Sequence, residues 1–223
     1  MTNSIVINGS EVPVKSSAMF TAQDEADCLA SPLFKDWAEN NDEGIKFSEI
    51  KLTDFDRFGK RIGFLKMTTK AKVNGVDVPG ICFLRSAAVS ILLRLICEGE
   101  TWVVCTRQAR IPVGRSALLE LPAGMTDDSG AFAGVAAKEL EEETGIRLPA
   151  EALIDLTAMA QSKDPHGTPS PLTSYDELHA SAIRGKAPGD RGMYPSAGGC
   201  NEFLRLMFHE RTVTREPVHL HKP

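Results

Sequence analysis

The most constraining feature of the sequence is the acidic segment KELEEETGI at residues 138–146. Four of the five residues from 139 to 143 are glutamates, and residues 131–144 have the composition of a helix. Gly145 follows that helix directly, where a left-handed residue often ends a helix. Like charges three and four positions apart on a helix repel one another. The segment is therefore either a solvated acidic face or a surface that binds a positive charge.

Helical geometry decides which of these carboxylates lie together. A helix turns by about 100° per residue, so Glu143 lies about 40° from Glu139 and Glu142 about 60° from it on the other side. Glu141 points away, and Leu140 faces the core. Hard cations such as Mg²⁺ bind carboxylate oxygens together with substrate phosphates. Glu139, Glu142 and Glu143 are therefore candidate ligands for Mg²⁺, or for Mn²⁺ in its place.

The first part of the chain, residues 1–84, has the pattern of a strand-rich N-terminal module. Asn8-Gly9 is a hairpin signal between two short apolar runs. Residues 24–40 have apolar side chains at helical spacing. Alternating apolar and polar residues then predict strands, with a turn at Asn74-Gly75. The predicted strands of this part are residues 47–55, 61–73 and 76–85.

Residues 85–223 form the second predicted domain. Asp127, Asp128 or Ser129 is placed to cap the acidic helix. Residues 149–160 favour a turn followed by a strand, and 161–192 are typical of a long surface loop with a short helix at 174–183. The remaining predicted strands are residues 88–96, 101–111, the start of 117–130, and 200–213.

Composition narrows the class of protein. The net charge of −5 and the absence of a long Lys/Arg run do not indicate a nucleic-acid partner. The longest apolar run, residues 87–97, contains Arg94 and is too short to span a bilayer. Five widely spaced cysteines and no secretory signal predict free, buried thiols in a reducing compartment. We therefore expect a cytoplasmic protein without membrane or nucleic-acid partners.

The segment around the acidic helix resembles the Nudix family of phosphate hydrolases, whose box reads G-x5-E-x7-R-E-U-x-E-E-x-G-U, with U a bulky aliphatic residue. Gly124 matches its first glycine, Glu139 its central glutamate, and the pair Glu142-Glu143 its later glutamates. Two positions depart from the box, since Gly130 replaces a glutamate and Lys138 replaces an arginine. Those two residues form an ion pair in the family, so their joint loss is one coupled change. Lys138 is still placed to pair with Glu142.

Two flanking stretches resemble one branch of the family, the ADP-ribose and ADP-sugar pyrophosphatases, and the plant-type ADP-sugar diphosphatases most closely. They are TRQARIPVGRSALLELPAGMTDD from residue 106 and MYPSAGGCNEFLRLMF from residue 193. The resemblance covers roughly residues 80 to 210. It implies an α/β/α sandwich with a mixed sheet. It also implies Mg²⁺-dependent hydrolysis of a nucleoside diphosphate sugar, ADP-ribose or ADP-glucose, to AMP and a sugar phosphate.

The resemblance also implies roles for individual residues. Glu139 and Glu143 would hold the metal, with Glu142 and the Ala123 carbonyl assisting. The residues expected along the substrate are Gln108, Arg110, Arg115, Ser196 and Gly198. Gln108 equally fits a dimer interface, because the same strand end pairs two subunits in this branch. The N-terminal strands of residues 1–84 also resemble parts that pair two subunits in this branch, so a homodimer is expected.

The end of the sequence departs from this branch. A further glutamate, a strand and a second long helix are expected after the strand predicted at residues 200–213, and the sequence does not match them. On the resemblance alone, the closing elements are missing and no catalytic base is assigned. A shortened, marginally stable and catalytically weak module that binds nucleotide is therefore the alternative to an active hydrolase.

Overall fold

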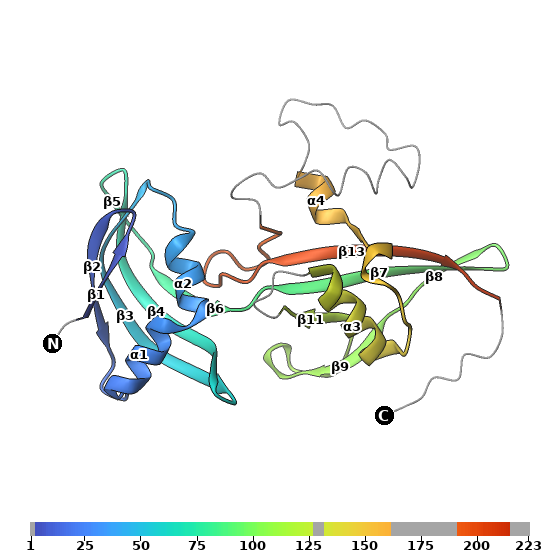
Figure 1. Ribbon diagram of the computed structural model, residues 1–223, viewed down its shortest axis with the longest axis horizontal. Helices are drawn as coiled ribbons and strands as arrows, with labels where there is room; N and C mark the ends of the chain where they lie inside the picture. Colours follow the sequence, from blue (N-terminus) through green and yellow to red (C-terminus); the bar gives the residue numbers. More distant parts are fainter. Residues whose placement is uncertain (1–2, 127–131, 162–190, 215–223) are drawn as a thin grey trace. The chain divides into compact units, whose positions relative to one another are not determined.

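A computed structural model describes residues 3–126, 132–161 and 191–214. The chain forms two compact units, each built around its own sheet (Figure 1). The first unit contains Met1–Ala87 and Tyr194–Glu202, and the second contains Ala88–Met193 and Phe203–Pro223. A short segment near the end of the sequence therefore belongs to the N-terminal unit.

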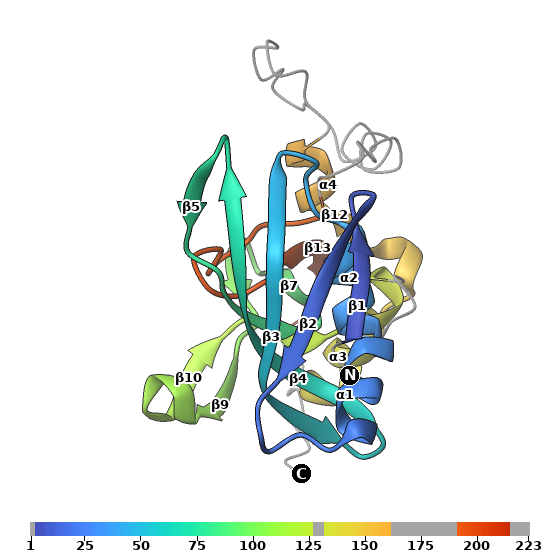
Figure 2. The ribbon, with the colours of Figure 1, turned by 90° about the vertical axis from the view of Figure 1, so that its left-hand side faces the viewer.

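The first unit contains a six-stranded sheet in the order β1-β2-β3-β4-β5, with β6 also paired to β4 (Figure 2). β2 and β3 run parallel and the other neighbours antiparallel. The Asn8-Gly9 and Asn74-Gly75 hairpins are confirmed, and all four residues have positive φ, as such turns require. The strands are β1 Asn3–Ile7, β2 Ser10–Ser16, β3 Ile45–Phe58, β4 Arg61–Val73, β5 Val76–Val78 and β6 Ile81–Arg85.

The predicted helical segment 24–40 is two helices, α1 Ala22–Ala30 and α2 Pro32–Glu39. Ser31 interrupts it with an extended backbone, φ −64° and ψ 146°. A residue before proline is disfavoured in the helical region, so Pro32 explains the break. The Ser31 hydroxyl then accepts a hydrogen bond from the Phe34 N–H at 3.2 Å and caps α2.

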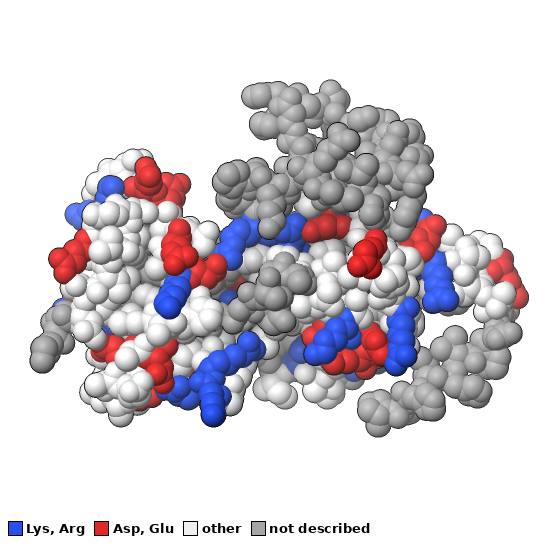
Figure 3. Space-filling view, in the orientation of Figure 1, with Lys and Arg blue, Asp and Glu red and all other residues white. Residues whose placement is uncertain are grey.

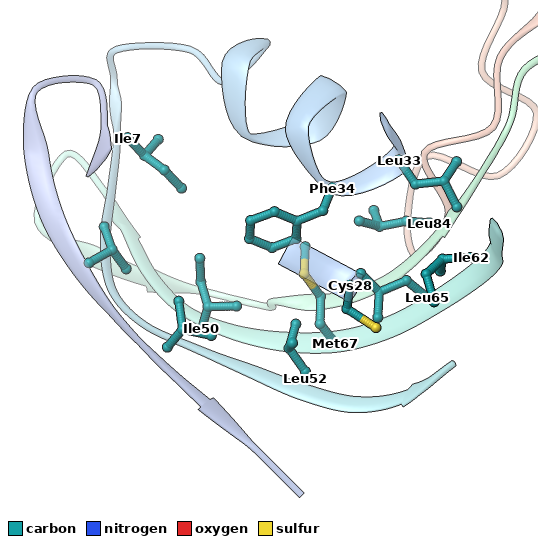
Figure 4. Packing of buried hydrophobic residues seen from close by; sticks show 12 residues of the cluster. Ile7, Cys28, Leu33, Phe34, Ile50, Leu52, Ile62, Leu65, Met67 and Leu84 are labelled. Atoms are coloured by element: carbon teal, nitrogen blue, oxygen red, sulfur yellow. The ribbon is translucent and has the colours of Figure 1, made fainter. Parts of the chain in front are cut away.

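These two helices pack on the sheet and bury the first hydrophobic core (Figure 4). Cys28 of α1 and Phe34 of α2 lie among Leu65 and Met67 of β4. Leu65, Met67 and Cys28 have no exposed surface. The alternating pattern of β4 therefore points one set of side chains at the helices, as its sequence predicts.

The second unit contains a five-stranded sheet in the order β11-β7-β13-β12, with β8 paired to β7, and a separate hairpin of β9 and β10. β7 and β13 are parallel and the other pairs antiparallel. The predicted α/β class, with mixed sheets after a strand-rich N-terminal module, is confirmed. The strands are β7 Ala88–Cys97, β8 Glu100–Val103, β9 Thr106–Arg110, β10 Arg115–Glu120, β11 Ala123–Met125, β12 Ile154–Asp155 and β13 Leu204–Thr212.

Helix α3, Phe132–Thr144, lies against this sheet and carries the acidic segment (Figure 1). Its Ala136 and Leu140 are fully buried against Ile91 and Leu93 of β7 and against Met207 of β13. After α3 the chain turns at Gly145, whose φ is 73° and whose N–H donates to the Glu141 carbonyl at 2.8 Å. The predicted left-handed helix end is therefore confirmed.

Two predictions for this unit need correction, and two lie outside the described residues. The predicted strand 101–111 is two strands, because β8 pairs with β7 whereas β9 pairs with β10. Segment 149–160 forms the turn Ala150–Ala152 and the short β12, and then helix α4, Leu156–Gln161. A second 3-10 turn, Ile111–Val113, joins β9 to β10. The capping candidates at 127–129 and the helix at 174–183 lie outside the described residues.

All five cysteines are free, but only Cys28 is fully buried, and Cys105 is exposed. The prediction of buried thiols is therefore wrong for Cys105, which lies between β8 and β9 rather than within a strand. Among the described helices, none has both the length and the apolar character needed to cross a membrane.

Candidate metal-binding and catalytic site

The acidic face of α3 is built as helical geometry predicts. Burial raises the pKa of Glu139, and the neighbouring negative charges of Glu142 and Glu143 raise that pKa further. The three carboxylates are therefore close enough to repel one another. Glu141 instead pairs with Arg147, with Nε and Oε1 at 2.6 Å.

The exposed part of α3 is partly neutralised by neighbouring cations. Lys138 Nζ lies 3.5 Å from Glu142 Oε1, so the pair predicted one turn apart is confirmed. Figure 3 shows acidic side chains gathered over α3 with basic side chains beside them. Both members of the Lys138–Glu142 pair are more than half exposed, so water screens the attraction between them.

Gly124 of β11 lies directly against Glu139. A Cβ atom added at Gly124 would meet the Glu139 Cδ at 2.0 Å and Oε1 at 2.3 Å. Gly124 has no positive φ in the structure, so its requirement for glycine comes from this close approach and not from backbone strain. The first glycine of the motif therefore makes room for the carboxylate at its centre.

Glu143 is held by two donors from two different strands. The Gln108 side-chain amide of β9 donates to Glu143 Oε1. The backbone N–H of Ala123, in β11, donates to Glu143 Oε2 at 3.3 Å. Both carboxylate oxygens are therefore oriented by hydrogen bonds, and Gln108 and Ala123 lie at the acidic face.

Arg110 also belongs to this cluster. Its guanidinium forks onto the Glu120 carboxylate, with Nε at 3.0 Å and Nη2 at 2.6 Å from Oε1. This hydrogen bonding raises the pKa of Arg110, and the charges of Glu120 and then of Glu143 raise it further. Arg110 thus pairs with a carboxylate, and it places a cation beside the acidic face. Arg115 is exposed at the start of β10.

The donor set fits a hard divalent cation. Within residues 3–126, 132–161 and 191–214, no group of three or more His, Cys, Asp or Glu side chains is arranged to hold a metal ion. Mg²⁺ does not need three protein ligands, since it binds through one or two carboxylates and keeps several waters. The crowded carboxylates of Glu139 and Glu143, with the space left by Gly124, provide oxygen donors of that kind.

Ser196 and Gly198 lie in the first unit, whereas the acidic face lies in the second. Their segment pairs with β6, where the Phe83 N–H donates to the Gly199 carbonyl at 2.7 Å. Its residues line a cavity of about 370 Å³ together with Trp37 and Leu84. The structure therefore does not group Ser196 and Gly198 with the glutamates, and their contact with substrate stays a prediction.

Sequence reasoning missed two contacts of the site. It did not identify Glu120 as the partner of Arg110, nor the Ala123 N–H as a donor to Glu143. The alternation of exposed and less exposed positions along β9 and β10 could have indicated the first contact. Arg110 and Glu120 both occupy the less exposed positions of their strands. The second contact depends on how β11 meets α3, which no local pattern encodes.

Comparison with known proteins places the site in a family. The NUDIX domain model matches residues 84–217. The chain is 36% identical over 218 residues to Nudix hydrolase 14, chloroplastic, from Arabidopsis thaliana, covering 93% of this chain and 62% of the relative. It is 44% identical over 57 residues to putative nudix hydrolase 2 from Caenorhabditis elegans, covering 26% of this chain and 25% of that protein.

The chain thus spans less than two thirds of the length of these relatives. Among solved structures, the crystal structure of an ADP compounds hydrolase is similar, with 12% sequence identity and a TM-score of 0.42. That match covers 78% of this chain and 73% of the other. The family model spans more than half of the chain and includes Gly124, α3 and Gly145. The chain belongs to the Nudix family.

Proposed function

We propose that this protein hydrolyses the diphosphate bond of a nucleoside diphosphate sugar, ADP-ribose or ADP-glucose, to AMP and a sugar phosphate. The observation that carries the proposal is the acidic face of α3, where Glu139 and Glu143 are positioned by β11 and β9 and a guanidinium lies beside them. Family membership and the flanking motifs that resemble the ADP-sugar branch support the substrate class.

Glu139 and Glu143 would hold Mg²⁺, or Mn²⁺, with Glu142 and the Ala123 carbonyl assisting. When bound, such an ion neutralises charge on the diphosphate and lowers the pKa of water. The protein itself supplies position. Gly124 keeps the Glu139 carboxylate close to β11, and Gln108 and Ala123 orient Glu143.

The cationic side chains near the site have a second role in the proposal. Arg110 adds positive charge beside Glu143, where diphosphate oxygens would approach. Arg115, the first residue of β10, is exposed and does not contribute to the hydrophobic core. We propose that both contact the substrate, with Arg110 exchanging part of its fork on Glu120 for phosphate oxygens.

The alternative is a catalytically weak module that binds nucleotide. One observation favours it, because the two late carboxylates in the described part of the chain are engaged in ion pairs. Glu202 pairs with Arg85 at 3.2 Å, and Glu210 pairs with Arg94. A carboxylate whose oxygens are engaged by an arginine is less available to a water molecule than a free one.

AMP release and nucleotide affinity together distinguish the active hydrolase from the binding module. The protein is incubated with ADP-ribose, ADP-glucose, NADH or diadenosine polyphosphates in the presence of Mg²⁺, and AMP release is measured. An active hydrolase releases AMP from an ADP-sugar, whereas a binding module shows nucleotide affinity by calorimetry without release. Glu143→Gln should lower the rate by about 10²- to 10³-fold, the effect of several kcal/mol of lost charge stabilisation. Equal hydrolysis by this variant and the parent would refute the proposal.

We also propose that the protein is a homodimer that pairs through the β9–β10 hairpin. Large apolar side chains are exposed there, with Ile111 82%, Val113 59% and Leu119 58% exposed. Exposed apolar groups of this kind mark association surfaces. Sedimentation at micromolar concentration should show a dimer, and Ile111→Asp should shift it to monomer. A parent protein that sediments as a monomer would contradict the proposal. The cytoplasmic location stays a prediction, since the Arabidopsis relative is named chloroplastic.

A further inference from the structure

Gln108 is placed to act on the metal site through Glu143. It lies on β9, whose positions alternate between exposed residues, Arg107 and Ala109, and the half-buried Thr106, Gln108 and Arg110. The half-buried face is the one that carries the contacts to Glu143 and Glu120. Gln108 therefore projects to the side of the strand where the acidic face lies.

The hydrogen bond from Gln108 leaves Glu143 able to bind a metal. A carboxylate offers about four lone-pair sites, and one donor to each oxygen occupies only part of them. The Gln108 amide takes one site on Oε1 and the Ala123 N–H one on Oε2. With both oxygens tethered, rotation of the carboxylate is restricted while lone pairs remain available.

The neutral amide suits this role better than a charged group. A lysine or arginine at the same place would satisfy the carboxylate charge and oppose binding of a cation. A second carboxylate would add repulsion to a cluster in which Glu142 and Glu143 already raise the pKa of Glu139. Among the described residues, the Gln108 side chain has no partner other than Glu143, so the contact is its main structural role there.

We propose that Gln108 is a positioning residue that orients the Glu143 carboxylate for a divalent cation, an inference that rests on the proposed function. Partners that hold a metal-binding carboxylate commonly contribute a factor of about 10 to 100 in metal affinity. Gln108 therefore acts on metal affinity first, and on the substrate only through the metal.

The test compares metal binding in the full chain and its variants. Gln108→Met keeps the side-chain volume and removes the donor, and Gln108→Asn keeps the amide but shortens its reach. Arg107→Ala is the matched control, because Arg107 is the exposed neighbour on the same strand. Mn²⁺ affinity is measured by the electron paramagnetic resonance of free Mn²⁺, with Mg²⁺ as competitor, and circular dichroism checks the fold.

We expect Gln108→Met and Gln108→Asn to weaken Mn²⁺ binding by about 10- to 100-fold and Arg107→Ala by less than about twofold. In the hydrolysis assay, the metal concentration for half-maximal rate should rise by the same factor. The KM for substrate at saturating metal should change little. If Gln108→Met does not fold, Gln108→Asn is compared with the parent instead.

Two failures are distinguishable. If the parent binds Mn²⁺ and both Gln108 variants bind it equally well, the positioning role is overturned while the proposed function stands. A higher KM for substrate with unchanged Mn²⁺ affinity would likewise overturn it and assign Gln108 to the substrate. If the parent itself binds neither Mn²⁺ nor Mg²⁺, the proposed function fails, and the positioning role fails with it.

Discussion

The interiors of the two compact units contain different kinds of side chain. In the first unit, the described core is apolar, with Leu65 and Met67 of β4 fully buried beneath α1 and α2. Ser31, which caps α2, is its only buried polar residue in the described part of the chain. In the second unit, Ser90, Thr126, Thr157 and Arg205 are all buried.

One of these buried polar residues, Ser90, holds the segment that leads into the candidate site. The Ser90 hydroxyl and the Ile91 N–H both donate to the Pro122 carbonyl, at 3.3 and 2.9 Å. Pro122 directly precedes Ala123 and Gly124, the residues that contact Glu143 and Glu139. Such groups cost free energy if they lose their partners. The comparison therefore indicates that apolar packing stabilises the first unit, whereas in the second unit buried hydrogen bonds also position the residues next to the candidate site.

The largest expected effect concerns the buried ion pair of the second unit. Arg205 is 7% exposed, and its Nη2 lies 2.5 Å from Asp155 Oδ2. Asp155→Ala would leave that guanidinium buried without its carboxylate and remove the Oδ1 acceptor of the Ala158 N–H. We expect a loss of about 3–5 kcal/mol in the free energy of unfolding, measured by urea denaturation.

The matched control for this pair is the double variant Asp155→Leu, Arg205→Met, which removes both charges. It should recover most of the stability, because an apolar pair of similar volume avoids the cost of burying charge. A double variant as unstable as Asp155→Ala would show that the unpaired charge does not determine the loss, and would assign it to packing and to the hydrogen bond from Ala158.

The second prediction tests the apolar core of the first unit. Leu65→Ala should lower the free energy of unfolding by about 2–5 kcal/mol, the cost of a cavity at a fully buried leucine.

The Cys28 thiol in the same core reports on this variant. Burial raises the pKa of that thiol to about 11, so Cys28 should resist alkylation at pH 8. Leu65→Ala should accelerate Cys28 labelling, detected by mass spectrometry, and leave Mn²⁺ affinity unchanged. Weaker Mn²⁺ binding in this variant would contradict the division between the two units.

The third prediction concerns the close approach of Gly124 to Glu139. Gly124→Ala places a methyl group where the Glu139 carboxylate lies and should cost about 1–3 kcal/mol of stability. Removing the obstacle with Glu139→Ala in the same chain should restore most of that loss, since neighbouring residues are not additive. Both single variants should weaken Mn²⁺ binding. Additive destabilisation in the double variant would show that the methyl group clashes with something other than Glu139.

The smallest expected effect is the acid response of the first unit. The pKa of Asp24 is lowered by a hydrogen bond from Thr21 and then by Arg57, and the pKa of Asp27 by Gln23 and then by Arg57. Because both folded pKa values lie below the ordinary 3.8, the stabilisation is present above pH 3.8 and is lost as the pH falls through them.

Arg57→Gln should therefore reduce the urea midpoint slightly near neutral pH and flatten its fall between about pH 4 and pH 2. High salt should shrink the difference, because these groups are exposed and screened. An unchanged pH profile in low salt would show that Thr21 and Gln23 alone lower the two pKa values.

Local sequence patterns predict much of the fold because their physics is local. Asn8-Gly9 and Asn74-Gly75 adopt the positive φ that a tight hairpin needs, and Gly145 ends α3 in the left-handed region. The break at Ser31-Pro32 is equally local, but helical periodicity alone predicted one segment across it, and the structure shows two helices. Helical periodicity also places Glu139, Glu142 and Glu143 on one face, since a helix fixes the angle between its own residues.

The sequence by itself thus determined the acidic face, the glycine that precedes it and the family to which both belong. Only the tertiary structure decided which groups meet that face. Gln108 and Glu143 are 35 positions apart. Tyr194–Glu202 belongs to the first unit although it lies more than a hundred positions after β6. Such contacts depend on how strands and helices pack together, and the free energy of packing depends on the whole core rather than on any short stretch of residues.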